Sequence, residues 1–421
     1  MNKKNEEGKF LAEYSLSKSI SFYNKTVVKQ SDRVMENTVI IYRDDLLPYS
    51  ETFIPAQVEN YSSYTGFYVG NSHCRGTKYP LPANRTLVLS DIVKLTPRRK
   101  LLFLITSLGY SSWFERLKAI SPVLIHAHFG IDGVWALPVK RKLKIPLVVT
   151  FHGYDITVNE STGEDLSELY GQNPLPQLYF WRRRQLFREA DCCIAVSEFI
   201  RSKLIAKGCP PDKILVHYIG VDIDKFAPNP RIQRKPVILF VGRLVEKKGC
   251  QYLIQAMAEV QSVMPELELV IIGDGKLRSL LERQAATSLQ RYRFLGAQSL
   301  EVVREWLNRS LLLCAPSVTD FLGNSEGLPM TIIEAQAMKL PVISSIHSGI
   351  PEAIVSGETG LLSPEKDWQS LAQDILTLAA NEELREKFAI AGRKRIEQQF
   401  NLKRNTAKLE EIYDNLLSKS H

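Results

Sequence analysis

The sequence lacks the marks of membrane-spanning, secreted and zinc-binding proteins. Its longest apolar runs, at residues 101–105 and 311–315, are far below the ~20 residues that a membrane-spanning helix needs. The opening stretch, MNKKNEEGKFLAEYSLSKS, is polar and has no apolar centre of the kind found in signal peptides. None of the six cysteines forms a C-x-x-C pair, which argues against a zinc or redox motif. We therefore expect a cytoplasmic protein that is not integral to a membrane.

A strong excess of any one residue class is also missing. The 421 residues are 44% hydrophobic and 24% charged, as in ordinary globular proteins, and suffice for two domains of about 200 residues. The net charge of +8 is uneven, because residues 1–230 carry +7 and the remainder +1. A basic first half indicates an anionic partner such as nucleic acid, phospholipid or a phosphorylated substrate. Solvated surface charge is the alternative.

Short apolar runs alternate with helix-length stretches along the chain. This alternation predicts an α/β fold made of two doubly wound, Rossmann-like domains whose parallel sheets face each other across a cleft. The predicted strands lie at 38–42, 101–106, 123–126, 147–151, 192–196, 214–217, 237–241, 267–272, 292–295, 311–315 and 341–344. The predicted helices include 177–189, 198–207 and 250–263.

The pattern also predicts the domain boundaries. Three prolines among polar residues mark 226–236 as a linker between the two domains. Apolar residues at helical spacing near the end of the chain predict a helix. We therefore expect an N-terminal arm of uncertain structure at 1–37, domains at 38–225 and 237–400, and a C-terminal helix at 401–421.

The first chemical motif, GRLVEKKG at 242–249, directly follows a predicted strand. Glycine allows a tight turn with close backbone approach. Arg243 can fork onto phosphate oxygens, and Lys248 supplies a point charge. The motif predicts a phosphate site, with a solvated basic turn as the alternative.

The second motif, EGLPMTIIE, spans residues 326–334. Pro329 suits the first turn of a helix, whose free N–H groups and positive dipole end would make an anion site. Glu334 lies about one turn into that helix, where its carboxylate could accept hydrogen bonds from sugar hydroxyls. Glu326 precedes the helix, at the predicted cleft.

Histidines end two strands in the first half. His152 and Gly153 follow the strand at 147–151, and the sequence HAHF ends another strand at 126–129. Histidines at such places are more often structural. At the mouth of the cleft, however, His152 could reach a bound sugar.

Two apparent motifs carry less weight. The sequence IIGDG, ending at Gly275, begins like a dinucleotide-binding fingerprint, but Arg278 stands where the third glycine would be. An NAD-dependent oxidoreductase is therefore disfavoured. Asp222 and Asp224 resemble a D-x-D metal pair, yet a turn and cap is the better interpretation at a linker.

Together these motifs form an ordered series that resembles one family. GRLVEKKG after a strand, IGDG thirty residues on, EGLPMTIIE, and an earlier His-Gly at a strand end are similar to the retaining glycosyltransferases of family 4, which have the GT-B fold. The likeness runs from about Thr38 to the C-terminus. In the first half, SETFI at 50–54 and HAHF resemble the subgroup that builds colanic-acid-type and other exopolysaccharides.

The resemblance implies a donor site in the second domain. Arg243 and Lys248 would neutralise the donor diphosphate, and Glu334 would bind the ribose hydroxyls. Glu326 would contact the transferred sugar, while Gly273 would permit close approach of the nucleotide. The donor-binding candidates are thus Arg243, Lys248, Gly273, Gly327, Leu328, Pro329, Met330, Thr331 and Glu334.

In the first domain the resemblance implies an acceptor site. His152 would lie over the reactive face of the sugar, and the C-terminal helix would cross back onto this domain. The acceptor-binding candidates are Ser50, Glu51, Thr52, His128 and Asp155. The catalytic candidates are Glu326, His152, Arg243 and Lys248.

The expected reaction moves a sugar, with retention of configuration, from a nucleotide-diphosphate sugar to a glycan acceptor. Cationic groups and helix amides can stabilise the leaving diphosphate, so we expect no cofactor and no metal requirement. Basic clusters at 98–100, 140–144 and 182–184 suggest docking on the anionic inner face of the plasma membrane, where a lipid-linked glycan would be the acceptor. Nucleic acid is not an expected partner.

Two alternatives stay open. One is a cytosolic synthase of the same fold that makes a soluble glucan or a disaccharide. The other is a non-catalytic protein that binds a nucleotide sugar or a glycan. A non-catalytic protein need not keep Arg243, Lys248, Glu326 and Glu334 together, so the full set argues for an enzyme.

Overall fold

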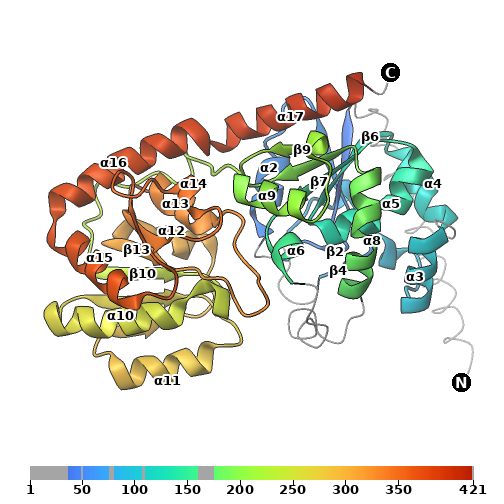
Figure 1. The fold of residues 1–421 in the computed structure, drawn as a ribbon. Coiled ribbons are helices and arrows are strands. Elements are labelled where there is room, and N and C mark those ends of the chain that lie inside the picture. Colours follow the sequence, from blue (N-terminus) through green and yellow to red (C-terminus); the bar gives the residue numbers. More distant parts are fainter. Residues whose placement is uncertain (1–36, 49–50, 75–79, 107–109, 160–174, 420–421) are drawn as a thin grey trace, which may run out of the picture.

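The structure, a computed structural model, describes residues 37–48, 51–74, 80–106, 110–159 and 175–419. It contains two parallel sheets, each covered by helices, that lie side by side, and the last two helices of the chain run one after the other along both of them (Figure 1). The N-terminal arm expected at 1–37 lies outside the described residues except for Asn37.

The first sheet has seven parallel strands in the order β5-β3-β1-β6-β7-β8-β9. The strands are β1 (Thr38–Tyr42), β3 (Thr65–Gly70), β5 (Thr86–Val88), β6 (Pro122–His128), β7 (Leu147–Phe151), β8 (Cys192–Ala195) and β9 (Ile214–Val216). The central strands are buried along their whole length, as strands covered on both faces must be. A separate pair is formed by β2 (Asp45–Leu46) and β4 (Ser72–His73).

Helices cover both faces of this sheet. Ile40 and Tyr42 of β1 point to the face that packs with the helices after β5 and β6, whereas Val39 and Ile41 point to the opposite face. The helical elements are α2 (Phe53–Val58), η2 (Ala83–Arg85), η3 (Leu89–Asp91), α3 (Pro97–Thr106), α4 (Ser111–Ala119), α5 (Gly130–Leu143), α6 (Tyr154–Thr157), α8 (Leu175–Glu189), α9 (Glu198–Ala206) and η4 (Pro211–Lys213).

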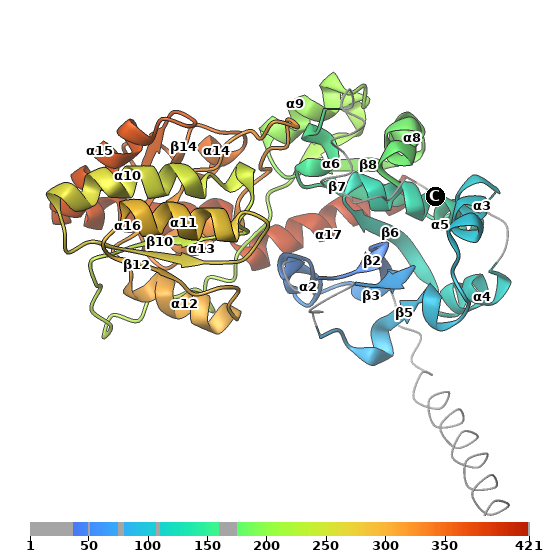
Figure 2. The same ribbon diagram turned by 90° about the horizontal axis from the view of Figure 1, so that it is seen from below.

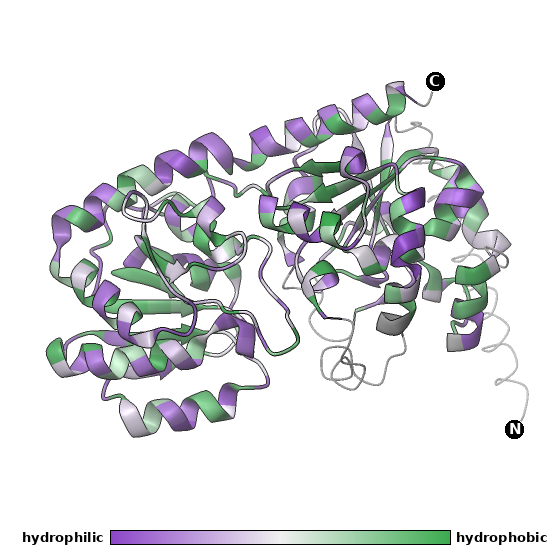
Figure 3. Ribbon diagram, viewed as in Figure 1, coloured by the Kyte–Doolittle hydropathy of each residue, from purple (hydrophilic) through white to green (hydrophobic). Residues whose placement is uncertain are grey.

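The second sheet has six parallel strands in the order β12-β11-β10-β13-β14-β15, the 3-2-1-4-5-6 order of a Rossmann fold. The strands are β10 (Val237–Val241), β11 (Glu268–Ile272), β12 (Tyr292–Phe294), β13 (Leu312–Ala315), β14 (Val342–Ser345) and β15 (Leu361–Ser363). The helical elements are η5 (Glu246–Lys248), α10 (Cys250–Val263), α11 (Arg278–Ser288), α12 (Leu300–Arg309), α13 (Met330–Ala337), α14 (Ile350–Ala353), α15 (Trp368–Ala380) and α16 (Glu382–Gln399). In Figure 3 the strands are mostly apolar and the helices carry polar outer faces.

One predicted strand is wrong. Residues 101–106 belong to α3, which begins at Pro97, a residue favoured in the first turn of a helix. Phe103 and Leu104 are buried, whereas the neighbouring Leu101, Leu102 and Ile105 are exposed. A short apolar run fits a helix as well as a strand, which explains the error.

The last helix, α17 (Leu402–Ser418), packs on the first sheet although it follows the second (Figures 1 and 2). Leu409 and Tyr413 are fully buried against the β1 face that carries Val39 and Ile41. Burial of two such side chains contributes roughly 1.5–3 kcal/mol each. Glu410 adds hydrogen bonds from the backbone N–H groups of residues 62–64.

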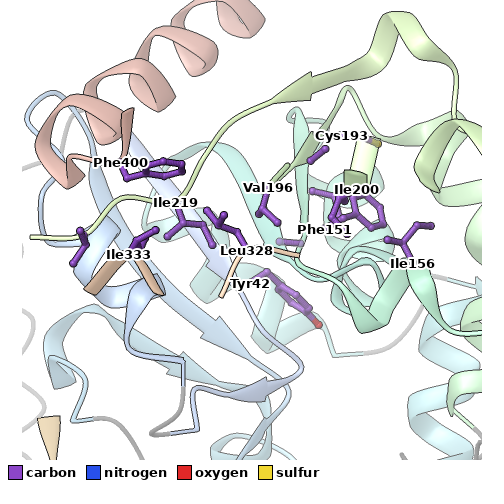
Figure 4. Close-up of a cluster of buried hydrophobic side chains, with 14 of the residues drawn as sticks. Tyr42, Phe151, Ile156, Cys193, Val196, Ile200, Ile219, Leu328, Ile333 and Phe400 are labelled. Carbon is purple, nitrogen blue, oxygen red and sulfur yellow. The ribbon is translucent and has the colours of Figure 1, made fainter. Parts of the chain in front are cut away.

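A continuous apolar core joins the two sheets. Leu328 and Ile333 of the second half lie in one buried cluster with Val196 and Ile200 of the first (Figure 4). Nearby, the two segments that cross between the halves pair with each other, because Val221 forms a parallel bridge with Asn401. These contacts fix how the carboxyl ends of the two sheets face each other.

Candidate active site

The loop after β10 carries the predicted phosphate-binding residues. Arg243 is exposed and no ion pair is recorded for it among the described residues. Lys248 is half-buried, and its Nζ lies 3.1 Å from Oε1 of Glu326. Lys247, which the sequence analysis missed, is buried with its Nζ 3.5 Å from the same oxygen. Two lysines therefore lie within 4 Å of one carboxylate, and the charge of Arg243 lies close enough to lower the pKa of that carboxyl as well.

Glu326 is ionised by its surroundings. Burial alone would raise the pKa of this carboxyl, but Lys247 and Lys248 lower the pKa well below its ordinary value. An incoming phosphate can therefore reach the two lysines only by competing with the carboxylate of Glu326. The fold therefore brings the GRLVEKKG and EGLPMTIIE motifs together, as their predicted roles require.

The start of α13 offers backbone donors. Pro329 is the N-cap and provides no side-chain hydrogen bond, so the first amides of the helix depend on other acceptors. Just before it, no hydrogen bond to the N–H groups of Gly327 and Leu328 is recorded within the described part of the chain. Met330 and Thr331 follow in the first turn and are half-buried. Free amides and a positive helix end make this a suitable anion site.

Glu334 lies one turn into α13 and is buried without a polar partner. No hydrogen bond to its carboxylate is recorded among the residues that the structure describes. Burial raises its pKa to about 7, and Lys225 opposes this only in part. A buried carboxylate without donors is costly unless a ligand supplies them, as ribose hydroxyls would.

Gly273 holds the loops after β10 and β11 together. Its φ of +142° is a conformation that side chains rarely adopt, and an added Cβ would overlap the carbonyl oxygen of Gly242. The close approach that this glycine allows in the structure is therefore between two loops of the protein. That approach shapes the loop carrying Arg243.

Glycines also let the two halves touch at the site. An added Cβ on Gly327 would overlap the carbonyl oxygen of His152, and one on Gly153 would lie 2.9 Å from the carbonyl oxygen of Ser325. The backbone N–H of Ser325 donates to Oγ1 of Thr157 at 3.1 Å. The loop with Glu326 thus rests directly on the His152–Gly153 turn.

A second contact between the halves lies on the same loop. Leu322 is buried with Val158 of the first half, and Tyr154 and Phe180 pack against this pair. The N–H of Asn159 donates to the carbonyl oxygen of Leu322 at 2.8 Å. The β13–α13 loop is therefore anchored in the first domain.

His152 is half-buried and ends a row of three histidines, of which His126 and His128 are buried. Its Nε2 lies 3.2 Å from Nδ1 of His128, and the rings of His128 and His126 are stacked with centroids 4.4 Å apart. Burial lowers the pKa of His152 and His128 well below the ordinary value and that of His126 to about 3, so all three are neutral at pH 7. Nδ1 of His152 and Nε2 of His128 are both buried and have no hydrogen-bond partner among the described residues.

The carboxylate of Asp155 is hydrogen-bonded to backbone N–H groups. Its carboxylate accepts hydrogen bonds from the N–H groups of Gly130, His152 and Gly153 at 2.8, 3.2 and 2.9 Å. Burial raises its pKa to about 6 although these bonds lower it. Asp155 and His128 lie beneath His152, so we infer that they would influence an acceptor through His152.

The segment after β1 supplies a charged network. Ser50 lies outside the described residues, and Thr52 precedes α2 as its N-cap. Glu51 accepts two hydrogen bonds from Arg43, at 2.9 and 2.7 Å, and Arg43 also pairs with Asp132. Burial alone would lower the pKa of Arg43, but Asp132 and Glu51 raise it above the ordinary value.

Arg43 is a site residue that the sequence analysis missed. Its guanidinium lies 4.6 Å from the ring centroid of Phe129, next to His152. Its position directly after a buried central strand was the available signal. Arg243 lies close enough to Glu51 to lower the pKa of that carboxyl against the effect of burial, so the network reaches the phosphate loop of the other half.

His347, which the sequence did not predict as a site residue, holds the backbone of Glu326 in place. Nε2 of His347, after β14, accepts the backbone N–H of Glu326 at 3.3 Å, and its Nδ1 lies 2.7 Å from Oε1 of Glu365. These partners select the tautomer with the proton on Nδ1. Gly349 also packs its backbone against the carbonyl oxygen of Gly327. The loop after β14 therefore positions the turn before α13.

The D-x-D pair lies away from these groups. Oδ1 of Asp222 accepts the N–H groups of Asp224 and Lys225 at 2.9 and 3.0 Å, and Asp224 pairs with Lys403. This is the turn and cap that the sequence favours. Across the described ranges, no group of three or more His, Cys, Asp or Glu side chains is arranged to hold a metal ion.

About half of the basic side chains in the three clusters are engaged within the protein. Lys140 pairs with Asp191, Arg141 with Glu189, and Arg182 is buried and donates to the carbonyl oxygen of Leu104 at 3.0 Å. Arg98, Arg99 and Arg184 are exposed. None of the helices within the described ranges is long and apolar enough to cross a bilayer.

Two sequence families match the chain. Residues 222–395 match the family described as "Glycosyl transferases group 1", and residues 73–225 match "Glycosyltransferase Family 4". The chain is 33% identical over 299 residues to the amylovoran biosynthesis glycosyltransferase AmsK of Erwinia amylovora, covering 69% of each protein. It is 31% identical over 288 residues to the WcaL protein of Salmonella typhimurium, which is named for colanic acid biosynthesis, covering 65% of this chain and 66% of WcaL.

Solved structures show the same fold. Anabaena Alr3699/HepE, in complex with UDP and glucose, superposes with a TM-score of 0.69 at 18% identity over 90% of this chain and all of HepE. The sucrose-phosphate synthase of Thermosynechococcus elongatus gives 0.70 at 19% identity, over 91% of this chain and 100% of that one. The architecture is therefore the GT-B fold, as the sequence predicts.

Fold and sequence define the class, a two-sheet GT-B protein whose strand ends carry cationic and acidic side chains. Within that class, the chain belongs to the glycosyltransferases of group 1 and family 4. The aligned regions span about two thirds of AmsK and WcaL.

Proposed function

We propose that the protein transfers a sugar, with retention of configuration, from a nucleotide-diphosphate sugar to a glycan in exopolysaccharide or other cell-surface polysaccharide synthesis. The observation that carries the proposal is that Lys248 meets Glu326 directly before α13, whose first amides have no side-chain cap, and that Glu334 lies one turn further along the same helix. Phosphate and ribose are the two groups that such a site recognises together. The relatives named for amylovoran and colanic acid biosynthesis support the product class.

In the proposed reaction the bond between the anomeric carbon and the diphosphate oxygen breaks, and a bond to the acceptor oxygen forms on the same face. Charge develops on the leaving diphosphate, where Arg243, Lys248 and the amides of Gly327 and Leu328 stabilise it. The proton of the acceptor hydroxyl passes to a leaving phosphate oxygen. Nδ1 of His152 contacts the sugar.

In the proposed reaction, Glu326 pairs with Lys247 and Lys248 before a diphosphate binds. It then turns toward the sugar as the two lysines contact phosphate. These cations supply the charge that a metal ion would otherwise bring, so we propose metal-independent transfer. The acceptor that we propose is a lipid-linked glycan reached from the cytoplasmic face of the membrane.

The test is a thermal-shift scan of the purified protein with UDP, GDP, ADP and dTDP, each in EDTA and in Mg²⁺. At 100 times its dissociation constant a nucleotide stabilises the fold by about 2.7 kcal/mol. UDP comes first because HepE was solved with UDP. A shift with one nucleotide in EDTA is expected, and its absence with every nucleotide would favour the non-catalytic alternative.

The matched variants are Lys248→Ala and Lys387→Ala, because Lys387 is exposed on α16. We expect Lys248→Ala to lower the rate of transfer about 10²–10³-fold, the usual cost of one lost transition-state donor. Lys387→Ala should leave it unchanged. Transfer to a soluble glucan or a simple sugar, with none to lipid-linked glycan, would favour the cytosolic synthase instead.

A further inference from the structure

Large apolar side chains are exposed together on α3 and α8. Leu101, Leu102 and Ile105 of α3 are 43, 57 and 50% exposed, and Trp181 of α8 is 72% exposed. A soluble protein normally shows such side chains singly. Their grouping on two neighbouring helices of one domain calls for a partner.

Arg182 shows that these side chains form one surface. Its Nη1 donates to the carbonyl oxygen of Leu104 at 3.0 Å, so its guanidinium reaches α3. The same guanidinium lies 5.4 Å from the ring centroid of Trp181. Arg182 therefore links α8, which carries Trp181, to the last turns of α3. Both helices pack against α5 on the same face of the first sheet.

The polar part of this surface has one sign of charge. Arg98, Arg99 and Arg184 are exposed, and no ion pair is recorded for them within the described part of the chain. The sequence of α3, PRRKLLFLIT, has no acidic residue. The only acidic residue of α8 is Glu189, which pairs with Arg141.

We propose that α3 and α8 form the surface by which the protein contacts an anionic lipid bilayer. The apolar side chains enter the boundary between head groups and acyl chains, where tryptophan is favoured. The arginines contact anionic head groups. A protein partner would need acidic residues opposite these arginines and an apolar groove for Trp181, whereas a bilayer supplies both features at any orientation around its normal.

The surface borders the proposed active site. Phe180, the neighbour of Trp181, packs against the buried pair Val158 and Leu322, and Leu322 lies on the loop that leads to Glu326. The surface and this loop are therefore connected through α8. The inference rests on the proposed lipid-linked acceptor for its biological meaning, but binding to lipid can be measured without any transfer.

The experiment is flotation of the whole protein with vesicles of phosphatidylcholine alone or with 30% phosphatidylglycerol. We expect binding only to the anionic vesicles at low salt, and a loss with rising salt. The double variant Arg98→Gln/Arg99→Gln should bind at least 10-fold more weakly, since each basic residue near the surface is worth about fivefold. Leu102→Ser/Trp181→Ser should lose binding to a similar extent.

Two controls keep the result interpretable. Leu280→Ser/Ile390→Ser removes equally exposed side chains from the second domain and should bind like the wild type. The nucleotide thermal shift should be the same in every variant, which shows that the fold and the donor site are intact. If that shift is missing in all proteins while flotation succeeds, the proposed function fails and the lipid surface stands.

Equal binding of the wild type and both surface variants would overturn the inference. So would a change from dimer to monomer in Leu102→Ser/Trp181→Ser, because the surface would then join two copies of the chain. Should a variant fail to fold, quenching by brominated lipid replaces it. Anionic brominated vesicles should quench the wild type more than Trp181→Phe, and equal quenching would contradict the proposal.

Discussion

Glu334 makes donor binding depend on pH in a direction that the structure fixes. Burial raises the pKa of this carboxyl to about 7. Ribose hydroxyls donate hydrogen bonds, and an ionised carboxylate accepts them more strongly than a protonated one does. Binding therefore favours the ionised form, and the observed affinity falls with the fraction of Glu334 that is ionised.

The magnitude follows from that fraction. With a pKa of about 7, roughly nine tenths of Glu334 is ionised at pH 8 and roughly one tenth at pH 6. The apparent dissociation constant is the intrinsic value divided by this fraction. Affinity for a nucleotide sugar should thus fall about 10-fold between pH 8 and pH 6, or about 1.4 kcal/mol.

The assay is isothermal titration of the nucleotide sugar that gives the largest thermal shift, at pH 6, 7 and 8. A nucleotide sugar is better than a free diphosphate because it has no terminal phosphate that titrates in this range. Asp132 also has a pKa of about 7, but it lies in the first domain beside Arg43. The variant Glu334→Gln isolates the effect, since its affinity should be lower at pH 8 and nearly flat across the range. Affinity that is independent of pH in the wild type, or that rises toward pH 6, would refute the role of Glu334.

Three further predictions concern the loops around Glu326. Gly327→Ala should abolish transfer of radiolabelled sugar, because its Cβ would overlap the carbonyl oxygen of His152. Gly392→Ala on α16, with only ordinary contacts around its Cβ, should stay active in that assay. His347→Phe should lower kcat by roughly 5–100-fold, since an unpaired N–H of Glu326 costs about 1–3 kcal/mol. His347→Asn should recover part of the lost rate. Equal rates for the wild type and His347→Phe would exclude positioning by His347. EDTA should leave the rate unchanged, and a loss of activity that Mg²⁺ restores would show that the cationic side chains do not suffice.

Strands and helices were predictable where the local sequence pattern fits only one type of secondary structure. The strand at 38–42 and the helix at 250–263 match β1 and α10, because an apolar run closed by a polar turn and a long amphipathic stretch are unambiguous. The strand β3 was not predicted, because the two glycines in its sequence TGFYVG weaken the strand pattern. The run at 101–106 was misassigned because three of its five apolar side chains face solvent in α3.

The candidate site divides in the same way. Residues that follow strands, such as Arg243, His152 and Glu326, were predictable because parallel sheets collect ligands at their carboxyl ends. Arg43 and His347 were not predicted, since their partners Asp132 and Glu365 come from other elements and only the folded chain brings them together. The roles of all these residues in binding and transfer stay predictions.

The most direct test of the account is transfer itself. The protein is incubated in EDTA with membranes and a radiolabelled nucleotide sugar of the base selected by the thermal-shift scan, and label is followed into the lipid-linked glycan fraction. The account predicts label in that fraction with the wild type and with Lys387→Ala, and a loss of at least 100-fold with Lys248→Ala. Equal labelling by the wild type and Lys248→Ala would contradict it, as would binding of the nucleotide sugar without any transfer.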